Sequence, residues 1–560
     1  MRKRLLYLLM LMPLASGVSA QDLNLPGLTS PKNVKVVDIG RYTEYVAKTL
    51  VTDSLTGKQD TVYQSVPEVA WQSQGEDIYN DSKAPRRAIT SFPYIGEMTG
   101  SMNEHIHDTH FMVFVYEYES VDCDGNPVTL SGIASCPDKG SLYVNNVVVG
   151  THITITSDNQ APSKHRKIDP KSPSDWSVIL AMAAYRIVQF DFLGQLGSDG
   201  INFGQNPEVE RDRENALSNY RDNLVIMPDY EGYGSTKDRA HPYLYQELTA
   251  RQVCDGVQAA IYAYQHSPEL KSIRFDFRPD WRMCIVGYSQ GGAVAMATHR
   301  FMEQNHLDEE FRLTGSLCGD GPYDLMSTLM YYTKRDLEGH VMSMPVVLPL
   351  IVKGMLDTNP YMRTHKAEDY FQQWFIDTNI MKWIEEKNMS TGDIERKFQD
   401  MHKDGKDGNK EYYKDLINAG GNSKMRDIMN AECYAYFKKI YEANKDTYKT
   451  AAGIPLPTKR GVMEDLHLAL ASNDMTEGWT PKHPIKLFHS DGDTVVPYDN
   501  AERAVAQFGN KAQLESSQHH HDHVDTGQDF LAGSLEEVLK NRELRLSLAI
   551  KEMLEKPLKE

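Results

Sequence analysis

Short apolar runs, each bounded by turn-forming residues, recur through the middle of the chain. The first two, at 111–116 and 127–136, flank the turn sequence Asp-Gly-Asn-Pro at 124–127 and predict an antiparallel hairpin. Five later runs are apolar without alternation, which is typical of strands covered on both faces of a mostly parallel sheet. They lie at 146–150, 223–229, 281–287, 313–318 and 484–489.

Helical patterns lie between and after these runs. Residues 248–265 separate two of the apolar runs, so strand, helix and strand predict a right-handed parallel crossover. The stretch 321–481 has helical spacing, is rich in Met, Lys, Asp and Tyr, and is too long for a loop in a compact domain. We therefore expect a helical insertion over one end of the sheet, and a final amphipathic helix at 534–554.

These patterns divide the chain into four parts. Residues 1–20 carry Arg2, Lys3 and Arg4, an apolar run at 5–14 and Val-Ser-Ala before Gln21, which predicts a secretory signal peptide cleaved after Ala20. A polar N-terminal segment with weak strand signals follows at 21–105. The α/β core is expected at 106–320 and 482–560, and the helical cap insertion at 321–481.

Composition narrows the class of protein. The 560 residues contain 60 Lys+Arg and 78 Asp+Glu, for a net charge of −18, which argues against nucleic acid as a partner. The apolar run near the N-terminus spans about ten residues, short of the ~20 that a membrane-spanning helix needs. We therefore expect an exported protein, periplasmic or extracellular, without an integral membrane span. Export permits disulfides among the six cysteines, although Cys284 and Cys318 also suit buried free thiols.

The sequence Gly287-Tyr288-Ser289-Gln290-Gly291 matches G-x-S-x-G, the nucleophile-elbow pattern. It follows a buried-type strand and opens an apolar helix at 292–297, which is the context that the pattern requires. The flanking glycines are expected where neighbouring chain segments crowd the turn. Ser289 is therefore the candidate nucleophile, and a purely structural turn is the alternative.

A nucleophilic serine needs a base and an orienting carboxylate, in the chain order Ser, Asp, His. Asp493, in the loop after the run at 484–489, is the candidate acid, with Asp491 as the alternate. Either aspartate could instead be a turn residue. His523 is the candidate base, because it begins the segment that leads into the last helix. Three neighbouring histidines are alternatives: His519, His520 and His521.

A histidine-rich tract can also bind metal. His519 and His523 are four residues apart, which suits one helical face, but no second ligand cluster of the expected type accompanies them. We therefore predict no metal site and no cofactor.

The developing oxyanion needs two backbone donors. The amide of Gln290, next after the nucleophile, is one candidate. The other is expected in the loop after 146–150, where Ile153 is favoured and Thr154 comes next. His152 in this loop is expected to be structural.

Further motifs fall in the same order. They are Pro-Asp-Tyr-Glu-Gly-Tyr-Gly at 228–234, His-Pro-Tyr at 241–243, and the segment from Asp493 to Pro497. With the elbow, they make the chain resemble an α/β-hydrolase, most similar to exported members related to the secretory lipases. The resemblance covers roughly 110–320 and 482–530. It implies an eight-stranded, mostly parallel sheet flanked by helices, a cap between the sixth and seventh strands, and serine esterase or lipase chemistry.

We therefore expect hydrolysis of a small-molecule or lipid ester through an acyl-enzyme intermediate. The apolar stretches 341–348 and 350–352 suit an acyl pocket or lid, and equally the insertion's own core. Two alternatives are a serine exopeptidase on the same fold and a non-catalytic exported binding protein.

Overall fold

The computed structural model describes most of the chain between residues 33 and 530. The described residues are 33–52, 59–75, 78, 111–136, 143–144, 146–164, 223–277, 279, 281–404, 424–516, 520–527 and 530. The predicted signal peptide at 1–20 and the predicted helix at 534–554 lie outside this set. Within it, the helices are too short or too polar to cross a membrane.

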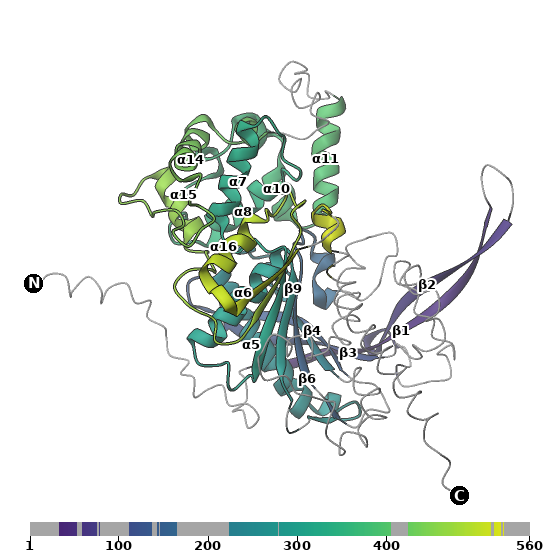
Figure 1. Ribbon diagram of the computed structural model, residues 1–560. Coiled ribbons are helices and arrows are strands. Elements are labelled where there is room, and N and C mark those ends of the chain that lie inside the picture. The colour runs from purple at the N-terminus through teal and green to yellow at the C-terminus, as the bar shows by residue number, and fades with distance from the viewer. Residues whose placement is uncertain are drawn as a thin grey trace, which may run out of the picture.

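A ten-stranded mixed sheet forms the centre of the described structure, in the order β12-β11-β10-β9-β6-β7-β4-β3-β1-β2 (Figure 1). Its strands are β1 (Lys35–Thr52), β2 (Gln59–Trp71), β3 (Phe111–Val121), β4 (Pro127–Cys136), β6 (Asn146–Thr151), β7 (Asn223–Pro228), β9 (Met283–Tyr288), β10 (Leu313–Gly319), β11 (Ile485–His489) and β12 (Ala512–Ser516). Strands β5 (Tyr143–Val144) and β8 (Asp276–Phe277) form a separate pair.

Six neighbouring strands, from β12 to β7, run parallel. The predicted apolar runs form these strands, and β6, β7 and β9 are almost entirely buried, as expected for strands covered on both faces. Helix α5 (Gln246–His266) connects β7 to β9 where the crossover was predicted, and helix α6 (Gln290–Gln304) connects β9 to β10. Because the strands are parallel, the loops after β6, β9, β10, β11 and β12 meet at one edge of the sheet.

The other half of the sheet is antiparallel and larger than predicted. The hairpin β3–β4 is confirmed, and β4 pairs antiparallel with β7. The weak strand signals in 21–105 correspond to two long strands, β1 and β2, which extend the expected eight-stranded sheet to ten (Figure 1). β1 pairs with the edge of β3, from Lys35 opposite Glu117 to Tyr42 opposite Phe111. A strand that pairs through its backbone with the edge of a sheet needs no strong alternation of apolar residues. The sequence of β1 and β2 therefore gave only a weak strand signal.

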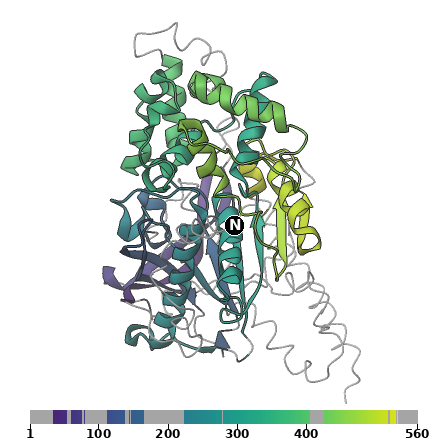
Figure 2. The same cartoon turned by 90° about the vertical axis from the view of Figure 1, so that its left-hand side faces the viewer.

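The predicted helical insertion lies between β10 and β11, which are the sixth and seventh strands of the main sheet when its strands are counted along the chain from β3. Its helices gather over one end of the sheet in two perpendicular views (Figures 1 and 2). They are α7 (Leu325–Leu337), α8 (Val347–Thr358), α9 (Gln373–Asp377), α10 (Ile380–Glu386), α11 (Thr391–Asp404), α13 (Met425–Ile428), α14 (Ala431–Asn444) and α15 (Val462–Ala471). Helix α16 (Asp499–Phe508) then follows β11 and leads to β12.

The insertion contacts the carboxyl edge of the parallel strands. Tyr332 on α7 donates a hydrogen bond to the carbonyl of Val495 in the loop after β11. Thr156, beyond β6, donates to the carbonyl of Met389 at 2.8 Å. The apolar stretch from 341 onward enters α8, where Leu348, Leu350, Ile351 and Val352 are buried, so much of it belongs to the insertion's own core.

Candidate active site

The G-x-S-x-G segment forms a tight turn from β9 into α6. Ser289 lies between the two elements with φ 57° and ψ −124°, a backbone conformation that L-residues rarely adopt. Its N–H donates to the carbonyl of Gly319 on β10 at 2.9 Å, which fixes the turn against the neighbouring strand. The serine is partly exposed, whereas the strand before it is buried. The turn therefore presents the Ser289 hydroxyl at the edge of the sheet.

The two motif glycines are needed because other backbone crowds this turn. A Cβ on Gly287 would lie 2.5 Å from the carbonyl carbon of Gly291, and one on Gly291 would lie 2.8 Å from the carbonyl carbon of Thr151. The Thr151 hydroxyl also donates to the carbonyl of Gly291 at 2.7 Å. The end of β6 is thus held directly against the start of α6.

The structure brings Ser289, His523 and Asp493 together from the loops after β9, β12 and β11. The Oγ of Ser289 lies 2.8 Å from Nε2 of His523, and Nδ1 of His523 lies 2.5 Å from Oδ2 of Asp493. In the neutral imidazole, Nδ1–H donates to the carboxylate and Nε2 accepts from the serine. This is the geometry in which an imidazole can remove the serine proton.

Asp493 is held in its ionised form by its surroundings. It is only 1% exposed, and burial alone would raise its pKa, but the charge and hydrogen bond of His523 outweigh burial and lower the pKa below its usual value. Its Oδ1 accepts the backbone N–H groups of Val495 at 2.7 Å and Val496 at 2.9 Å. Nearby His489 donates from Nε2 to the carbonyl of Val496 at 2.9 Å, and burial lowers its pKa to about 4. His489 is therefore neutral and supports the loop.

The alternative acid and one alternative base contact each other instead. Nδ1 of His520 lies 2.5 Å from Oδ1 of Asp491, and both side chains are exposed, at 72% and 41%. His521 contributes its carbonyl, which accepts from the Ser490 hydroxyl at 2.8 Å. His519 lies outside the described residues. Of the described histidines in this tract, His523 is the one hydrogen-bonded to Ser289.

The predicted oxyanion donors lie at the start of α6 and in the loop after β6, which are held together by the contact between Thr151 and Gly291. Gln290 is the first residue of α6, and Ile153 lies two residues beyond β6. Within the described chain, the backbone N–H groups of Gln290 and Ile153 have no hydrogen-bond acceptor. Both donors therefore remain available to a ligand.

His152, beside Ile153, has the structural role that was expected. Its ring stacks on Tyr230 with centroids 3.7 Å apart, and its Nδ1 donates to the carbonyl of Ile153 at 2.7 Å. Tyr230 in turn donates to the carbonyl of His152 at 3.1 Å. These contacts fix the loop that carries Ile153.

No role was assigned from the sequence to three residues at this site. His241 lies with its Nε2 at 3.2 Å from the side-chain nitrogen of Gln290, and burial lowers its pKa to about 3. Tyr288 and Asp320 lie behind the triad, where the Tyr288 hydroxyl is 3.1 Å from Oδ2 of Asp320. Asp320 directly follows a parallel strand, and that position was the available signal for it.

Among the residues that the structure describes, two groups of side chains have the composition of metal ligands. One is Asp320, Asp493 and His523 at the triad, and the other is His299, Glu303 and His483. The Glu303 carboxylate accepts from His299 at 2.9 Å, from the ring and backbone N–H of His483 at 2.9 and 2.8 Å, and from the backbone N–H of Lys482. These donors already occupy its lone pairs, so the second group is a structural network.

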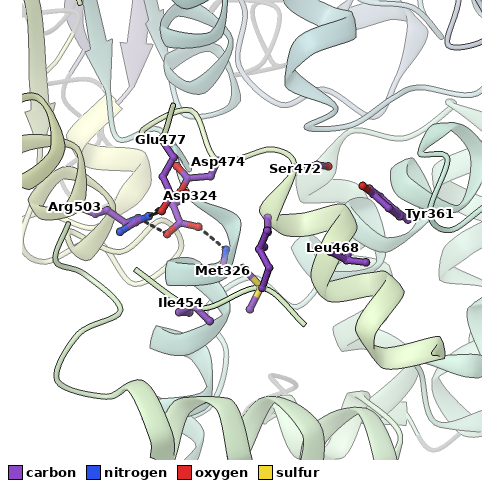
Figure 3. Close-up of a pocket in the computed structure, with 11 residues that line it drawn as sticks. Asp324, Met326, Tyr361, Ile454, Leu468, Ser472, Asp474, Glu477 and Arg503 are labelled. Atoms are coloured by element: carbon purple, nitrogen blue, oxygen red, sulfur yellow. Dashed lines mark hydrogen bonds and ion pairs between the residues drawn. The ribbon is translucent and has the colours of Figure 1, made fainter. Parts of the chain in front are cut away.

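A cavity of about 160 Å³ lies between the insertion and α16 (Figure 3). Its polar wall consists of Arg503, which is 2% exposed, and three carboxylates that converge on its guanidinium, from Asp324, Asp474 and Glu477. The triad residues do not line it. Since Arg503 pairs with all three carboxylates, this is not the open acidic patch that would bind a peptide amine.

Several solved structures are similar to this chain. The rice cell wall degrading esterase LipA from Xanthomonas oryzae has a TM-score of 0.50 and 21% identity, over 80% of this chain and 94% of that one. A hydrolase structure from Legionella pneumophila has a TM-score of 0.49 and 15% identity, over 77% and 89%. Candida antarctica lipase A has a TM-score of 0.44 and 13% identity, over 77% and 74%.

No family model matches the chain, and no curated protein matches it by sequence. The likeness to LipA, together with the strand order, shows the fold: the chain has an α/β-hydrolase fold with a helical insertion between β10 and β11. The fold that the sequence resemblance implied is confirmed.

Proposed function

We propose that the protein is an exported serine hydrolase that cleaves carboxylic esters, with Ser289 as nucleophile, His523 as base and Asp493 as orienting acid. The observation that carries the proposal is the hydrogen-bonded chain from Ser289 through His523 to Asp493, at 2.8 and 2.5 Å. The chain order Ser, Asp, His is that of α/β-hydrolases. Export is the part of the proposal that rests on the sequence of residues 1–20.

In the first half-reaction, His523 takes the proton of the Ser289 hydroxyl as the serine oxygen attacks the ester carbonyl carbon. The imidazolium that forms is stabilised by Asp493, whose pKa is already held below its usual value. The carbonyl oxygen becomes an oxyanion, which the amides of Gln290 and Ile153 can bind. His523 then returns the proton to the departing alcohol, which leaves an acyl group on Ser289.

In the second half-reaction, water takes the place of the alcohol. His523 removes a proton from this water as it attacks the acyl carbonyl, and the same two amides bind the second oxyanion. Collapse of this intermediate releases the carboxylic acid and returns the proton to Ser289. Each residue of the triad thus takes part in both half-reactions, and neither half-reaction as written uses a cofactor.

A carboxylic ester is the favoured substrate because the solved structure with the highest TM-score among those compared above is described as an esterase. A peptidase would need a group that holds a charged peptide terminus, and the carboxylates of the insertion cavity are paired with Arg503.

The chain contains a matched control for this proposal. Asp491 and His520 form the same kind of carboxylate–imidazole pair as Asp493 and His523, at the same 2.5 Å distance, but at the surface. We expect Ser289→Ala and His523→Ala to lower kcat for p-nitrophenyl esters by about 10⁴- to 10⁶-fold. We expect Asp491→Asn and His520→Ala to retain the wild-type rate.

Labelling with a fluorophosphonate probe provides the second measurement. The wild type should react at Ser289, and Ser289→Ala should remain unlabelled while keeping its thermal stability. Full activity in Ser289→Ala would overturn the proposal. Activity on aminoacyl amides without activity on esters would replace the esterase by an exopeptidase, and a wild type that neither labels nor turns over would indicate a binding protein.

A further inference from the structure

A second buried carboxyl group, Asp320, lies beside the triad. It follows β10, the strand between the one that carries the nucleophile and the one that carries the acid. Asp320 is fully buried, its φ is 34°, and its N–H donates to the carbonyl of Phe488 on β11 at 2.9 Å. The end of the β10–β11 ladder thus directs its side chain into the site.

The side chain of Asp320 has three polar neighbours. Its Oδ1 accepts the N–H of Ser490 at 3.3 Å, and its Oδ2 lies 3.1 Å from the Tyr288 hydroxyl. A carboxylate oxygen of Asp320, a carboxylate oxygen of Asp493 and a ring nitrogen of His523 all lie within 4.8 Å of one another.

The titratable groups that face Asp320 offer it no permanent positive charge. Tyr288 faces it from β9, Asp493 from the loop after β11, His523 from the segment after β12, and Tyr323 from its own segment. Within the described residues, Asp320 forms no ion pair with a lysine or arginine. A second carboxylate charge would therefore lie beside that of Asp493 without compensation.

The number of hydrogens available to Tyr288, Asp320 and Asp493 indicates which of the two aspartates is protonated. The Tyr288 hydroxyl has one hydrogen. Its oxygen lies 2.5 Å from the carbonyl oxygen of His523, and because a carbonyl oxygen can only accept, the hydrogen of Tyr288 is donated there. Asp493 already accepts from Val495, Val496 and His523, and as a carboxylate it has no hydrogen to donate. A hydrogen bond between the two neighbouring aspartates would therefore have to take its hydrogen from a protonated Asp320. The pKa of Asp320 is raised well above its usual range, mainly by burial and next by the negative charge of Asp493, which agrees with a protonated Asp320.

We propose that Asp320 is protonated in the working enzyme and donates a hydrogen bond to Asp493, which it holds in place against His523. The inference rests on the proposed function, because it assigns Asp320 a role at the same triad. Among the hydrogen bonds of the described residues, Asp320 makes none to Ser289 or to the oxyanion donors, so we assign it as a positioning residue that acts through Asp493. Its loss should lower kcat and leave KM unchanged.

Two substitutions separate a proton donor from a space-filling group. Asp320→Asn keeps one donor and one acceptor in the same shape and cannot ionise, so we expect a kcat within about threefold of the wild type. Asp320→Ala removes the donor to a charged group, and we expect a ten- to hundredfold lower kcat at constant KM, about the range for such a bond. An Asp320→Asn variant as impaired as Asp320→Ala would overturn the inference, as would an Asp320→Ala variant with wild-type kcat.

Infrared spectroscopy measures directly whether the carboxyl group of Asp320 is protonated. The wild-type minus Asp320→Asn difference spectrum at pH 8 should contain the carbonyl stretch of a protonated carboxylic acid, shifted in D₂O. A carboxylate band in its place would overturn the inference, even if Asp320→Ala failed to fold. Fluorophosphonate labelling of the wild type keeps the two proposals apart. Without labelling the proposed function fails, whereas labelling at equal rates in the wild type and in Asp320→Ala overturns only the role of Asp320.

Discussion

Replacing Gly291 by alanine tests whether the contact between β6 and α6 sets the oxyanion site. The new Cβ would lie 2.8 Å from the carbonyl carbon of Thr151, 2.9 Å from the carbonyl oxygen of His152, and closer still to the carbonyl oxygen of Thr151. Ordinary contacts begin at 3.4 Å, so the carbon alone must move by 3.4 − 2.8 = 0.6 Å, and the oxygen farther. These are backbone atoms of the loop that carries Ile153, and no side-chain rotation relieves the clash.

The expected loss of kcat can be estimated from this displacement of the backbone. A misplacement of about 1 Å can cost about a hundredfold in rate, and loss of one oxyanion donor costs about 10²- to 10³-fold. We therefore expect Gly291→Ala to lower kcat for p-nitrophenyl esters by at least about a hundredfold, with a smaller change in KM. Gly392→Ala is the matched control, because a Cβ there meets nothing within 4 Å, and it should keep the wild-type kcat.

Thermal unfolding shows whether Gly291→Ala is folded. A folded variant with kcat within threefold of the wild type would refute the reasoning, because the two amides would then not depend on this contact. If the variant does not fold, Thr151→Val offers a milder test. It removes only the hydroxyl that donates to the carbonyl of Gly291 at 2.7 Å, and we expect about a tenfold loss of kcat. Full activity in Thr151→Val would then count against the same idea.

Three further predictions concern the stability and the thiols of the protein. Burial raises the pKa of Glu395 to about 7 from 4.5, so the folded state keeps a proton that the unfolded state releases, and stability falls as the pH rises through this window. Glu395→Gln should therefore raise Tm at pH 8 but not at pH 4, and equal shifts at both would contradict this. Arg503→Met leaves Asp324 and its neighbouring carboxylates uncompensated and should cost about 3–5 kcal/mol of unfolding free energy in urea titration, whereas a loss below about 1 kcal/mol would contradict the ion cluster. The six cysteines form no disulfide in the described structure and five of them are buried, so a thiol reagent should modify Cys123 first in the native state and six thiols in denaturant, and fewer than six would indicate a disulfide.

Local sequence pattern was sufficient for most of the core. Uninterrupted apolar runs predict buried parallel strands, because only a strand covered on both faces excludes polar residues from both sides. The nucleophile elbow could be predicted for the same reason: strand, turn and helix are contiguous, and the glycines around Ser289 respond to crowding within a few residues. The antiparallel edge could not be predicted in this way, since β1 is stabilised by pairing with β3, more than sixty residues away in the chain.

The sequence by itself predicted the candidate nucleophile, the strands of the parallel core and the loops in which an acid and a base should be sought. Only the tertiary structure decided which members of those loops meet. Ser289 and His523 are 234 residues apart, and His520, three residues earlier, pairs with Asp491 at the surface instead. Strand order in the sheet sets such distances, and periodicity along the chain carries no information about it. For the same reason, Asp320 resembled an ordinary strand-end residue until the sheet placed it between Tyr288 and Asp493.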